Sequence, residues 1–413
     1  MSLFQLIGAL ITAVAVFGYI NHRFIGLPDT IGITAMGLLV SLILAVSGNF
    51  VPGAVDWASE VSGRLDLPEV VFHGLLSVLL FAGSLHVNIA ELAKQRVAVF
   101  GLATVGVLIS TVLVGYGTHA LLALLGTPVA LGYCLLFGAL ISPTDPIAVL
   151  GVLKTVGVPK SLEMNIAGES LFNDGTGVVA YLVLLGIVTG ASEPTFAHVG
   201  TLLLTEVLGA LVVGLAAGYV AFFMLKGVES YAVEILITLA LATGGYSLAE
   251  LLHVSAPLSV VVMGLVIGNH GARSAMSDKT REHLFSFWEL LDEVLNLFLF
   301  GLIGIKLLSL HTEGVDWWAA VAIVPLVLAV RLVSVSVPVF ALRPWLTPEP
   351  HRVKVLFWGG LRGGISVALA LSMPEFEGHD LLVLATYAVV LFSLLIQAPT
   401  LGPLLERLGV SRR

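Results

Sequence analysis

Long apolar runs recur along the whole chain and constrain its fold more than any other feature. A segment of about 20 apolar residues is long enough to cross the hydrocarbon core of a bilayer as a helix. About thirteen such runs lie around residues 2–20, 30–47, 70–88, 97–125, 129–153, 161–190, 199–225, 231–252, 255–269, 284–309, 317–342, 353–373 and 380–402. Only 11% of the residues are charged, against roughly 25% in soluble domains. The sequence therefore predicts an all-α polytopic membrane protein, with residues 1–413 in a single transmembrane domain.

The lysines and arginines of the connecting segments fall almost wholly on one side when the runs are threaded alternately through a membrane. Fifteen lie on that side, against Arg64 and Lys306 on the other. Because cytoplasmic loops carry the excess of Lys and Arg, we expect the amino terminus outside and the carboxyl terminus in the cytoplasm. The acidic residues gather in the outside loops, so the net charge of −8 gives no indication of nucleic-acid binding.

Two acidic residues interrupt the run at 161–190. Glu169, Ser170, Asn173 and Asp174 would share about 140° of arc on one helix face, at 3.6 residues per turn. An ionisable group near the membrane midplane costs roughly 2.5–3.5 kcal/mol on insertion scales and is usually retained for function. This face is therefore the candidate site for ion or proton movement.

The run at 129–153 contains a predicted helix break. Pro143 and Pro146 stand three residues apart, which removes two backbone donors and disfavours helix before each proline. Non-helical backbone at membrane depth persists only when it is buried in protein or lines a water-filled cavity. We therefore expect Thr144 and Asp145, which lie between the prolines, to belong to a site.

A second break is predicted at residues 359–364, where four glycines surround Leu361 and Arg362. The two broken runs are the fifth and the twelfth, an odd number of spans apart. Corresponding halves would then have opposite orientations, which is the inverted-repeat arrangement of many transporters. In that arrangement Asp145 would face the amino ends of half-helices, and Arg362 the opposing carboxyl ends.

Three motifs, in this order and at this spacing, resemble those of the NhaP/NHE sodium/proton antiporters. They lie at residues 142–146 (SPTDP), 168–175 (GESLFNDG) and 359–363 (GGLRG). The resemblance covers essentially the whole membrane chain. It implies an NhaA/NhaP-like inverted-repeat fold with thirteen helices, two of them broken and crossed. It also implies a homodimer in the inner or plasma membrane that serves sodium and pH homeostasis.

The resemblance further divides the chain into two subdomains that move against each other. The core, which would translocate the ion, comprises about residues 97–190 and 317–405. The dimerisation or scaffold subdomain comprises about residues 1–96 and 199–309. The transported species would be Na⁺ or Li⁺ and H⁺, and no cofactor is expected.

The same likeness assigns ligands to the transported cation. It makes Asp174 the carboxylate that holds either a cation or a proton, with Ser170 and the Thr144 carbonyl as further ligands and Asn173 as a support acting through water. Burial disfavours the charged form of a carboxyl group and a bound cation favours it, so cation and proton would compete for Asp174. With one titrating group on this face, we expect electroneutral 1:1 exchange. The structural alternative is that Asp174 is an acid neutralised by a nearby base.

Two arginines, Arg331 and Arg362, lie inside apolar runs and need partners. The resemblance pairs Arg331 with Glu169 as a structural ion pair. This interpretation agrees with the physical chemistry, because an unpaired buried charge is severely destabilising. For Arg362 two roles remain open, orienting the crossing of the broken spans and shaping an ion pathway.

One stretch departs from the family pattern. Some relatives place an acid in the third span near the ion, whereas residues 79–83 here read LLFAG, with Phe81 at the centre. A ligand is missing or is replaced from elsewhere. The acidic run Glu289, Asp292 and Glu293 fits either a cation funnel or pH sensor, or a solvated helix start.

Three other functions share some of these features. A K⁺/H⁺ antiporter of the same fold would have an identical acidic face, and an ion channel would conduct without counter-transport. A membrane-embedded hydrolase would need a nucleophile and its base, and the sequence contains neither a Gly-x-Ser-x-Gly elbow nor His-Glu-x-x-His. The expected function is thus secondary active transport of monovalent cations and protons, without enzymatic activity.

Overall fold

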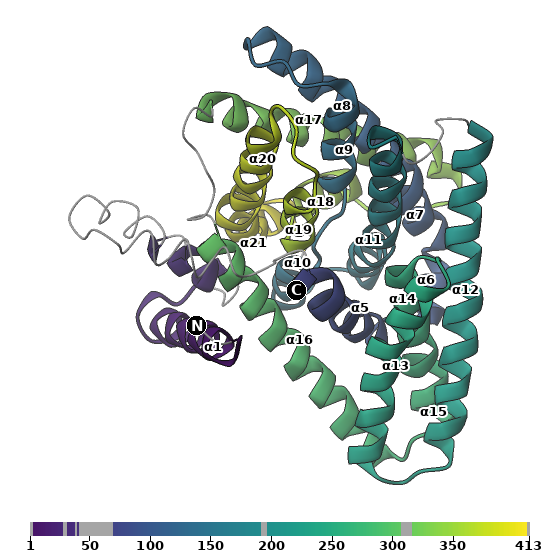
Figure 1. Ribbon diagram of the computed structural model, residues 1–413. Helices are drawn as coiled ribbons and strands as arrows, with labels where there is room; N and C mark the ends of the chain where they lie inside the picture. The colour runs from purple at the N-terminus through teal and green to yellow at the C-terminus, as the bar shows by residue number, and fades with distance from the viewer. Residues whose placement is uncertain are drawn as a thin grey trace.

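A computed structural model describes residues 3–27, 31–37, 39–40, 69–190, 196–306 and 316–410. Within these ranges the regular structure is helical and includes no strand (Figure 1). The α-helices are α1 (Leu3–Ile20), α5 (Leu76–Leu85), α6 (Ile89–Lys94), α7 (Arg96–Phe100), α8 (Val107–Leu124), α9 (Leu131–Leu140), α10 (Ile147–Val156), α11 (Lys160–Val188), α12 (Phe196–Lys226), α13 (Tyr231–Leu251), α14 (Ala256–Val266), α15 (Ala272–Ser274), α16 (Asp278–Lys306), α17 (Trp317–Ala341), α18 (Arg352–Trp358), α19 (Gly364–Leu371), α20 (His379–Phe392) and α21 (Ala398–Arg407).

Short π-helical segments continue several of these helices, and one short 3₁₀ turn follows α17. They are η1 (Asn21–Ile25), η2 (Val70–Leu75), η3 (Gly101–Gly106), η4 (Ile267–Gly271) and η7 (Ser393–Gln397), with η6 (Arg343–Trp345) as the 3₁₀ turn. A π-helical turn widens the helix and often lies near a functional site.

Six helical stretches in the described part of the chain are long and apolar enough to cross a membrane. They are Arg96–Leu124, Lys160–Val188, Leu204–Lys226, Tyr231–Leu251, Trp317–Ala341 and His379–Arg407. Shorter apolar helices accompany them at Leu76–Leu85, Leu131–Leu140 and Ala256–Gly271. Half of the predicted run at 30–47, and Arg64, lie outside the described residues. The count of thirteen spans stays a prediction.

The helices pack around separate apolar clusters. One cluster joins α8, α9, α17, α19 and α20, and another joins α5, α13 and α14; α16 contributes buried residues to both. In Figure 1 the first group lies in the upper centre and left of the view, and α12 to α15 lie on the right. α11 contacts both α9 and α14, and therefore lies between the two groups.

Both predicted breaks interrupt helices in the structure. α9 ends at Leu140 and α10 begins at Ile147, so the chain between them holds both prolines in non-helical backbone. α18 ends at Trp358 and α19 begins at Gly364. The two interruptions touch, because the Asp145 backbone N–H donates a 2.8 Å hydrogen bond to the Leu361 carbonyl. That the two spans cross at the membrane midplane stays a prediction.

Close approach of α8 and α9 holds the first broken segment against its neighbour. A Cβ added at Gly138 of α9 would collide with the Thr111 carbonyl of α8, whereas one added at Gly244 of α13 would meet nothing. Overpacking a filled interface costs roughly 1–3 kcal/mol. Gly138 is therefore needed for this helix pair.

We predict that Gly138→Ala lowers the melting temperature of the detergent-purified protein, because the added methyl group forces α8 and α9 apart. Gly244→Ala makes the same chemical change on an exposed helix face and serves as the matched control, with no loss of melting temperature expected. Equal melting temperatures for the two variants would contradict the close packing of α8 and α9.

Candidate functional site

The polar face of α11 lies inside the protein. Glu169, Ser170, Asn173 and Asp174 are all buried, with Asp174 6% exposed and Asn173 1% exposed. The helical spacing that the sequence shows therefore does bring four oxygen-bearing side chains onto one buried face. No described group donates a hydrogen bond to the Asp174 carboxylate.

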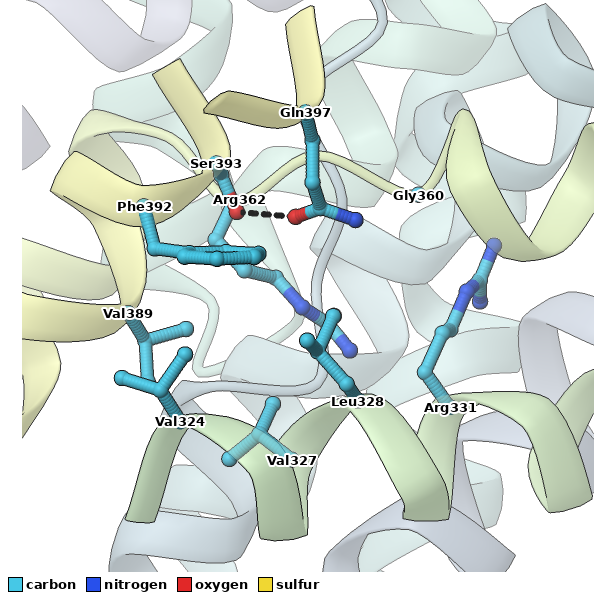
Figure 2. Close-up of a pocket in the computed structure, with 10 residues that line it drawn as sticks. All are labelled: Val324, Val327, Leu328, Arg331, Gly360, Arg362, Val389, Phe392, Ser393 and Gln397. Carbon is cyan, nitrogen blue, oxygen red and sulfur yellow. Dashed lines mark hydrogen bonds between the residues drawn. The ribbon is translucent and has the colours of Figure 1, made fainter. Parts of the chain in front are cut away.

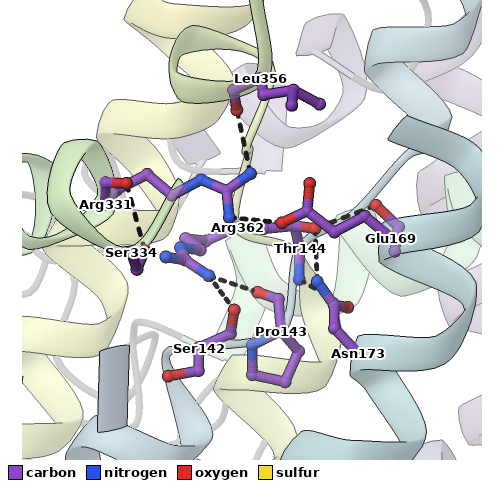
Figure 3. Close-up of polar contacts among 10 residues, drawn as sticks. Ser142, Pro143, Thr144, Glu169, Asn173, Arg331, Ser334, Leu356 and Arg362 are labelled. Atoms are coloured by element: carbon purple, nitrogen blue, oxygen red, sulfur yellow. Dashed lines mark hydrogen bonds and ion pairs between the residues drawn. The ribbon is translucent and has the colours of Figure 1, made fainter. Parts of the chain in front are cut away.

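Three of the predicted site residues form one hydrogen-bonded group (Figure 3). The Asn173 amide binds Thr144 at two atoms, donating 2.8 Å to the Thr144 hydroxyl and accepting 3.2 Å from the Thr144 backbone N–H. The Thr144 hydroxyl also lies 2.9 Å from the Ser170 hydroxyl. Asn173, expected to act through water, thus fixes the first helix break directly against α11.

Arg331 connects three helices at the back of this site (Figure 3). Its guanidinium, which comes from α17, lies 2.6 Å from a Glu169 carboxylate oxygen on α11 and donates a 2.9 Å hydrogen bond to the Leu356 carbonyl of α18. Both charged side chains are buried, at 8% and 3% exposure. A Cβ at Gly360 would collide with this guanidinium, so glycine leaves the room that the ion pair needs.

Arg362 satisfies the carbonyls that the first break releases. Its guanidinium donates to the carbonyl oxygens of Ser142 and Pro143, the latter at 2.9 Å (Figure 3). These carbonyls follow the carboxyl end of α9, where the helix dipole favours a cation. Asp145 lies just before α10 and against Gly363, which precedes α19. The acid is therefore at two helix amino ends and the base at a helix carboxyl end.

A cavity of about 370 Å³ opens beside the two breaks. Its wall is built from α5, both broken segments, α11 and α16. Six carboxylate side chains line it, and none of the lysines or arginines whose side chains are described does so. The six are Asp145, Glu163, Asp174, Glu289, Asp292 and Glu293. Such a set of like charges with low-dielectric walls attracts cations.

The α5 wall of this cavity is apolar apart from His86. Phe81, at the position where some relatives carry an acid, is fully buried and packs on Trp288 of α16 with ring centroids 4.6 Å apart. Leu79, Leu80 and Gly83 face the cavity instead. No carboxylate therefore comes from α5 in this part of the structure.

A second, much smaller hollow lies behind the breaks (Figure 2). It measures about 10 Å³ and shares no lining residue with the acidic cavity. Arg331, Arg362 and Gln397 line it, and the Ser393 hydroxyl donates a 2.9 Å hydrogen bond to the Gln397 amide oxygen. The broken segments thus separate a basic side from an acidic side.

Several contributors to the site carry no sequence signal strong enough to identify them beforehand. The Leu356 carbonyl that binds Arg331 is a backbone group, and Gln397 lies in an ordinary apolar run. Asn296 and Ser366 also line the acidic cavity. The sequence marks residues whose charge is out of place in a membrane, but neutral polar groups are common there.

The chain matches known proteins over nearly all of its length. The family model described as "Sodium/hydrogen exchanger, transmembrane" matches residues 11–407. The chain is 46% identical over 409 residues to the Na(+)/H(+) antiporter NhaP of Pseudomonas aeruginosa, covering 98% of this chain and 96% of the relative. It is 33% identical over 388 residues to the Na(+)/H(+) antiporter NhaH of Halobacillus dabanensis, covering 93% and 92%.

A solved structure has the same fold. The sodium proton antiporter MjNhaP1 from Methanocaldococcus jannaschii, determined at pH 8, matches with a TM-score of 0.76 at 22% identity over 99% of each chain. The predicted all-α membrane fold of the NhaP type is confirmed at this level.

We predict that Arg331→Ala destabilises the protein strongly, by roughly 3–5 kcal/mol, because it leaves the Glu169 carboxylate buried and unpaired. The measurement is the melting temperature of the purified protein. Removing both charges, as in Glu169→Leu with Arg331→Met, should recover much of the loss. Arg343→Ala, which removes an exposed arginine, is the charge-matched control. An Arg331→Ala protein as stable as the wild type would overturn the structural assignment of the ion pair.

Proposed function

Because the chain belongs to the sodium/hydrogen exchanger family, we propose that it exchanges Na⁺, or Li⁺, for H⁺ across the plasma membrane. One observation carries the proposal. Asp174 is buried beside two helix breaks, lines the acidic cavity, and receives no hydrogen bond from any described group. A buried carboxylate in this state needs a cation or a proton.

The exchange follows from competition at this one carboxylate. Burial penalises the charged form of Asp174, and either a proton or a cation removes that penalty. The two cannot occupy the same oxygen atoms together, so each displaces the other. Each time the protein changes the side to which the site is open, it therefore carries one species or the other.

The neighbouring groups suit a small hard cation. Na⁺ and Li⁺ prefer oxygen ligands, by the same reasoning that applies to other hard cations. The Thr144 and Ser170 hydroxyls lie 2.9 Å apart beside Asp174 on the α11 face, and the Thr144 carbonyl belongs to the same broken segment. In our proposal these oxygens and the Asp174 carboxylate bind the ion, and Asn173 holds the segment in position.

The same arrangement favours one cation per proton. Glu169 is held by Arg331 and Asn173 is neutral, so Asp174 is the one carboxylate on this helix face left to change its charge. A site that is neutral with a proton and neutral with Na⁺ carries no net charge in either direction. The proposed exchange is therefore electroneutral.

Alternating access requires one part of the protein to move against another. We propose the core at about residues 97–190 and 317–405 and the scaffold at about residues 1–96 and 199–309, with the scaffold also forming the homodimer. Most of one apolar cluster belongs to the proposed core and most of the other to the proposed scaffold, and α16 packs in both through residues such as Leu299 and Trp288. The acidic cavity has walls from both parts, namely α5 and α16 on one side and α11 with the broken segments on the other.

The charge of the loops supports an inward-facing state. Glu163 and His86 line the cavity, and both lie close in sequence to Lys160 and Lys94, which the positive-inside rule assigns to the cytoplasm. The cavity thus opens to the cytoplasm in the proposed orientation, with the amino terminus outside.

We predict that Asp174→Asn abolishes exchange, because the amide can neither take up a proton nor supply the negative charge that the cation needs. Everted vesicles carrying a pH gradient are given Na⁺, Li⁺ or K⁺, and collapse of the gradient is followed with a pH-sensitive dye. Glu377→Gln, which removes an exposed carboxylate, should exchange like the wild type. Unchanged exchange by Asp174→Asn would remove Asp174 from the mechanism, and a response to K⁺ alone would replace the sodium assignment.

We also predict that a membrane potential leaves the exchange rate nearly unchanged, since no net charge moves in a 1:1 cycle. Proteoliposomes with the purified protein are energised with valinomycin and a K⁺ gradient, once K⁺ itself has been shown not to exchange. A rate that changes several-fold with the sign of the potential would contradict electroneutral exchange.

A further inference from the structure

The α16 wall of the acidic cavity carries a polar pair that the exchange mechanism does not use. Asp292 and Asn296 lie one helical turn apart, and both line the cavity. The Asn296 amide nitrogen donates 2.8 Å to the Asp292 carbonyl and 3.2 Å to the Asp292 carboxylate. These two bonds orient the amide and leave its oxygen as an acceptor with no role inside the protein.

Two buried oxygen atoms at this wall have no partner. Asn296 is 1% exposed and its Oδ1 accepts no hydrogen bond, and Ser366 of α19 is also 1% exposed with an unpartnered hydroxyl. Leaving a buried polar atom unsatisfied is unfavourable. α16 and α19 pack together here, with Leu299 against Gly364. The cavity wall therefore presents two oxygens that require a donor or a positive ion.

The charge around the Asn296 and Ser366 oxygens favours a positive ion over a neutral hydrogen-bond donor. Asp292 is partly buried and adds a negative charge to the two neutral oxygens. Within the described residues, no three carboxylate, imidazole or thiol groups converge as a multivalent metal would require. One carboxylate with an amide and a hydroxyl oxygen matches a monovalent hard cation.

Asp292, Asn296 and Ser366 line the same cavity as Asp174 of the proposed transport site. Asp145 lies in the broken segment that Asn173 binds to α11, next to Asp174, and Asp292 lies on α16. All three line the same cavity. A cation that enters from the cavity mouth thus has a path along negative charges from α16 to α11.

We propose that Asp292, Asn296 and Ser366 form a second cation site, in which an incoming Na⁺ is held before it reaches Asp174. The inference rests on the proposed function, since it names a loading site for the same ion. α5 provides no carboxylate to this cavity, and the loading site places one on α16 instead. Because Ser366 lies on the core and Asp292 and Asn296 lie on the scaffold of the proposed division, the bound ion bridges the two parts in the inward-facing state.

The test separates the two sites by removing the first. Purified Asp174→Asn protein is titrated with NaCl or with choline chloride, and the melting temperature is recorded. A ligand that binds only the folded protein raises its stability with concentration. We expect Asp174→Asn to keep a saturable, Na⁺-specific rise in melting temperature. Adding Asp292→Asn or Asn296→Leu should abolish the rise, and adding Ser366→Ala should weaken it.

Glu293→Gln in the same background is the matched control. It removes an exposed carboxylate from the same helix and the same cavity, so it reports the effect of net charge alone. This variant should keep the Na⁺-specific rise in melting temperature. No Na⁺-specific rise in Asp174→Asn, or a rise that survives both Asp292→Asn and Asn296→Leu, would overturn the proposal. Failure of exchange in wild-type vesicles would reject the proposed function without altering these results.

The position of the ion is tested with Tl⁺, whose anomalous scattering locates it in crystals. We expect two peaks in the wild type, one at Asp174 and one at Asn296 and Ser366, and only the second peak in Asp174→Asn. A single peak at Asp174 in the wild type would show that the unpartnered oxygens bind water, and would overturn the second site.

Discussion

A carboxylate buried among apolar helices cannot keep its charge without a partner, and the site is arranged around this constraint. Each of the other buried charges next to it has a partner within the protein: Arg331 binds Glu169, and Arg362 binds two carbonyls of the first break. Asp174 has no such partner among the described groups. In the exchange that we propose, its charge is balanced by whatever the cavity delivers, so that the cation and the proton are alternatives.

The broken helices make this arrangement possible. In an unbroken helix every interior carbonyl accepts a hydrogen bond from the same helix. The two interruptions leave backbone N–H and C=O groups without such bonds at the depth of the site. These groups are satisfied across the breaks, through the hydrogen bond from Asp145 to Leu361 and through Arg362. The proline pair and the glycine cluster thus fix where the acid, the hydroxyls and the cavity meet, and they separate the acidic side from the arginines.

Sequence reasoning identified the fold class and the polar face of α11 because misplaced charges and prolines are rare in apolar spans. Asp174, Glu169 and Arg331 stand out for that reason, and the positions of both breaks follow from backbone chemistry. The direct hydrogen bonds between Asn173 and Thr144 could not be found from the sequence, and the support through water that it predicted for Asn173 stays a prediction. Asn296 and Ser366 could not be found beforehand, because a lone neutral polar residue in a helix shows neither its direction nor its partners.

The central claim is that one cation displaces one proton from Asp174. Isothermal titration of the purified protein with NaCl, in buffers of different ionisation enthalpy, measures the protons released for each Na⁺ bound. The account predicts release of about one proton where Asp174 is protonated before binding, and loss of that release in Asp174→Asn. Na⁺ binding without proton release, or the same release from Asp174→Asn, would contradict it.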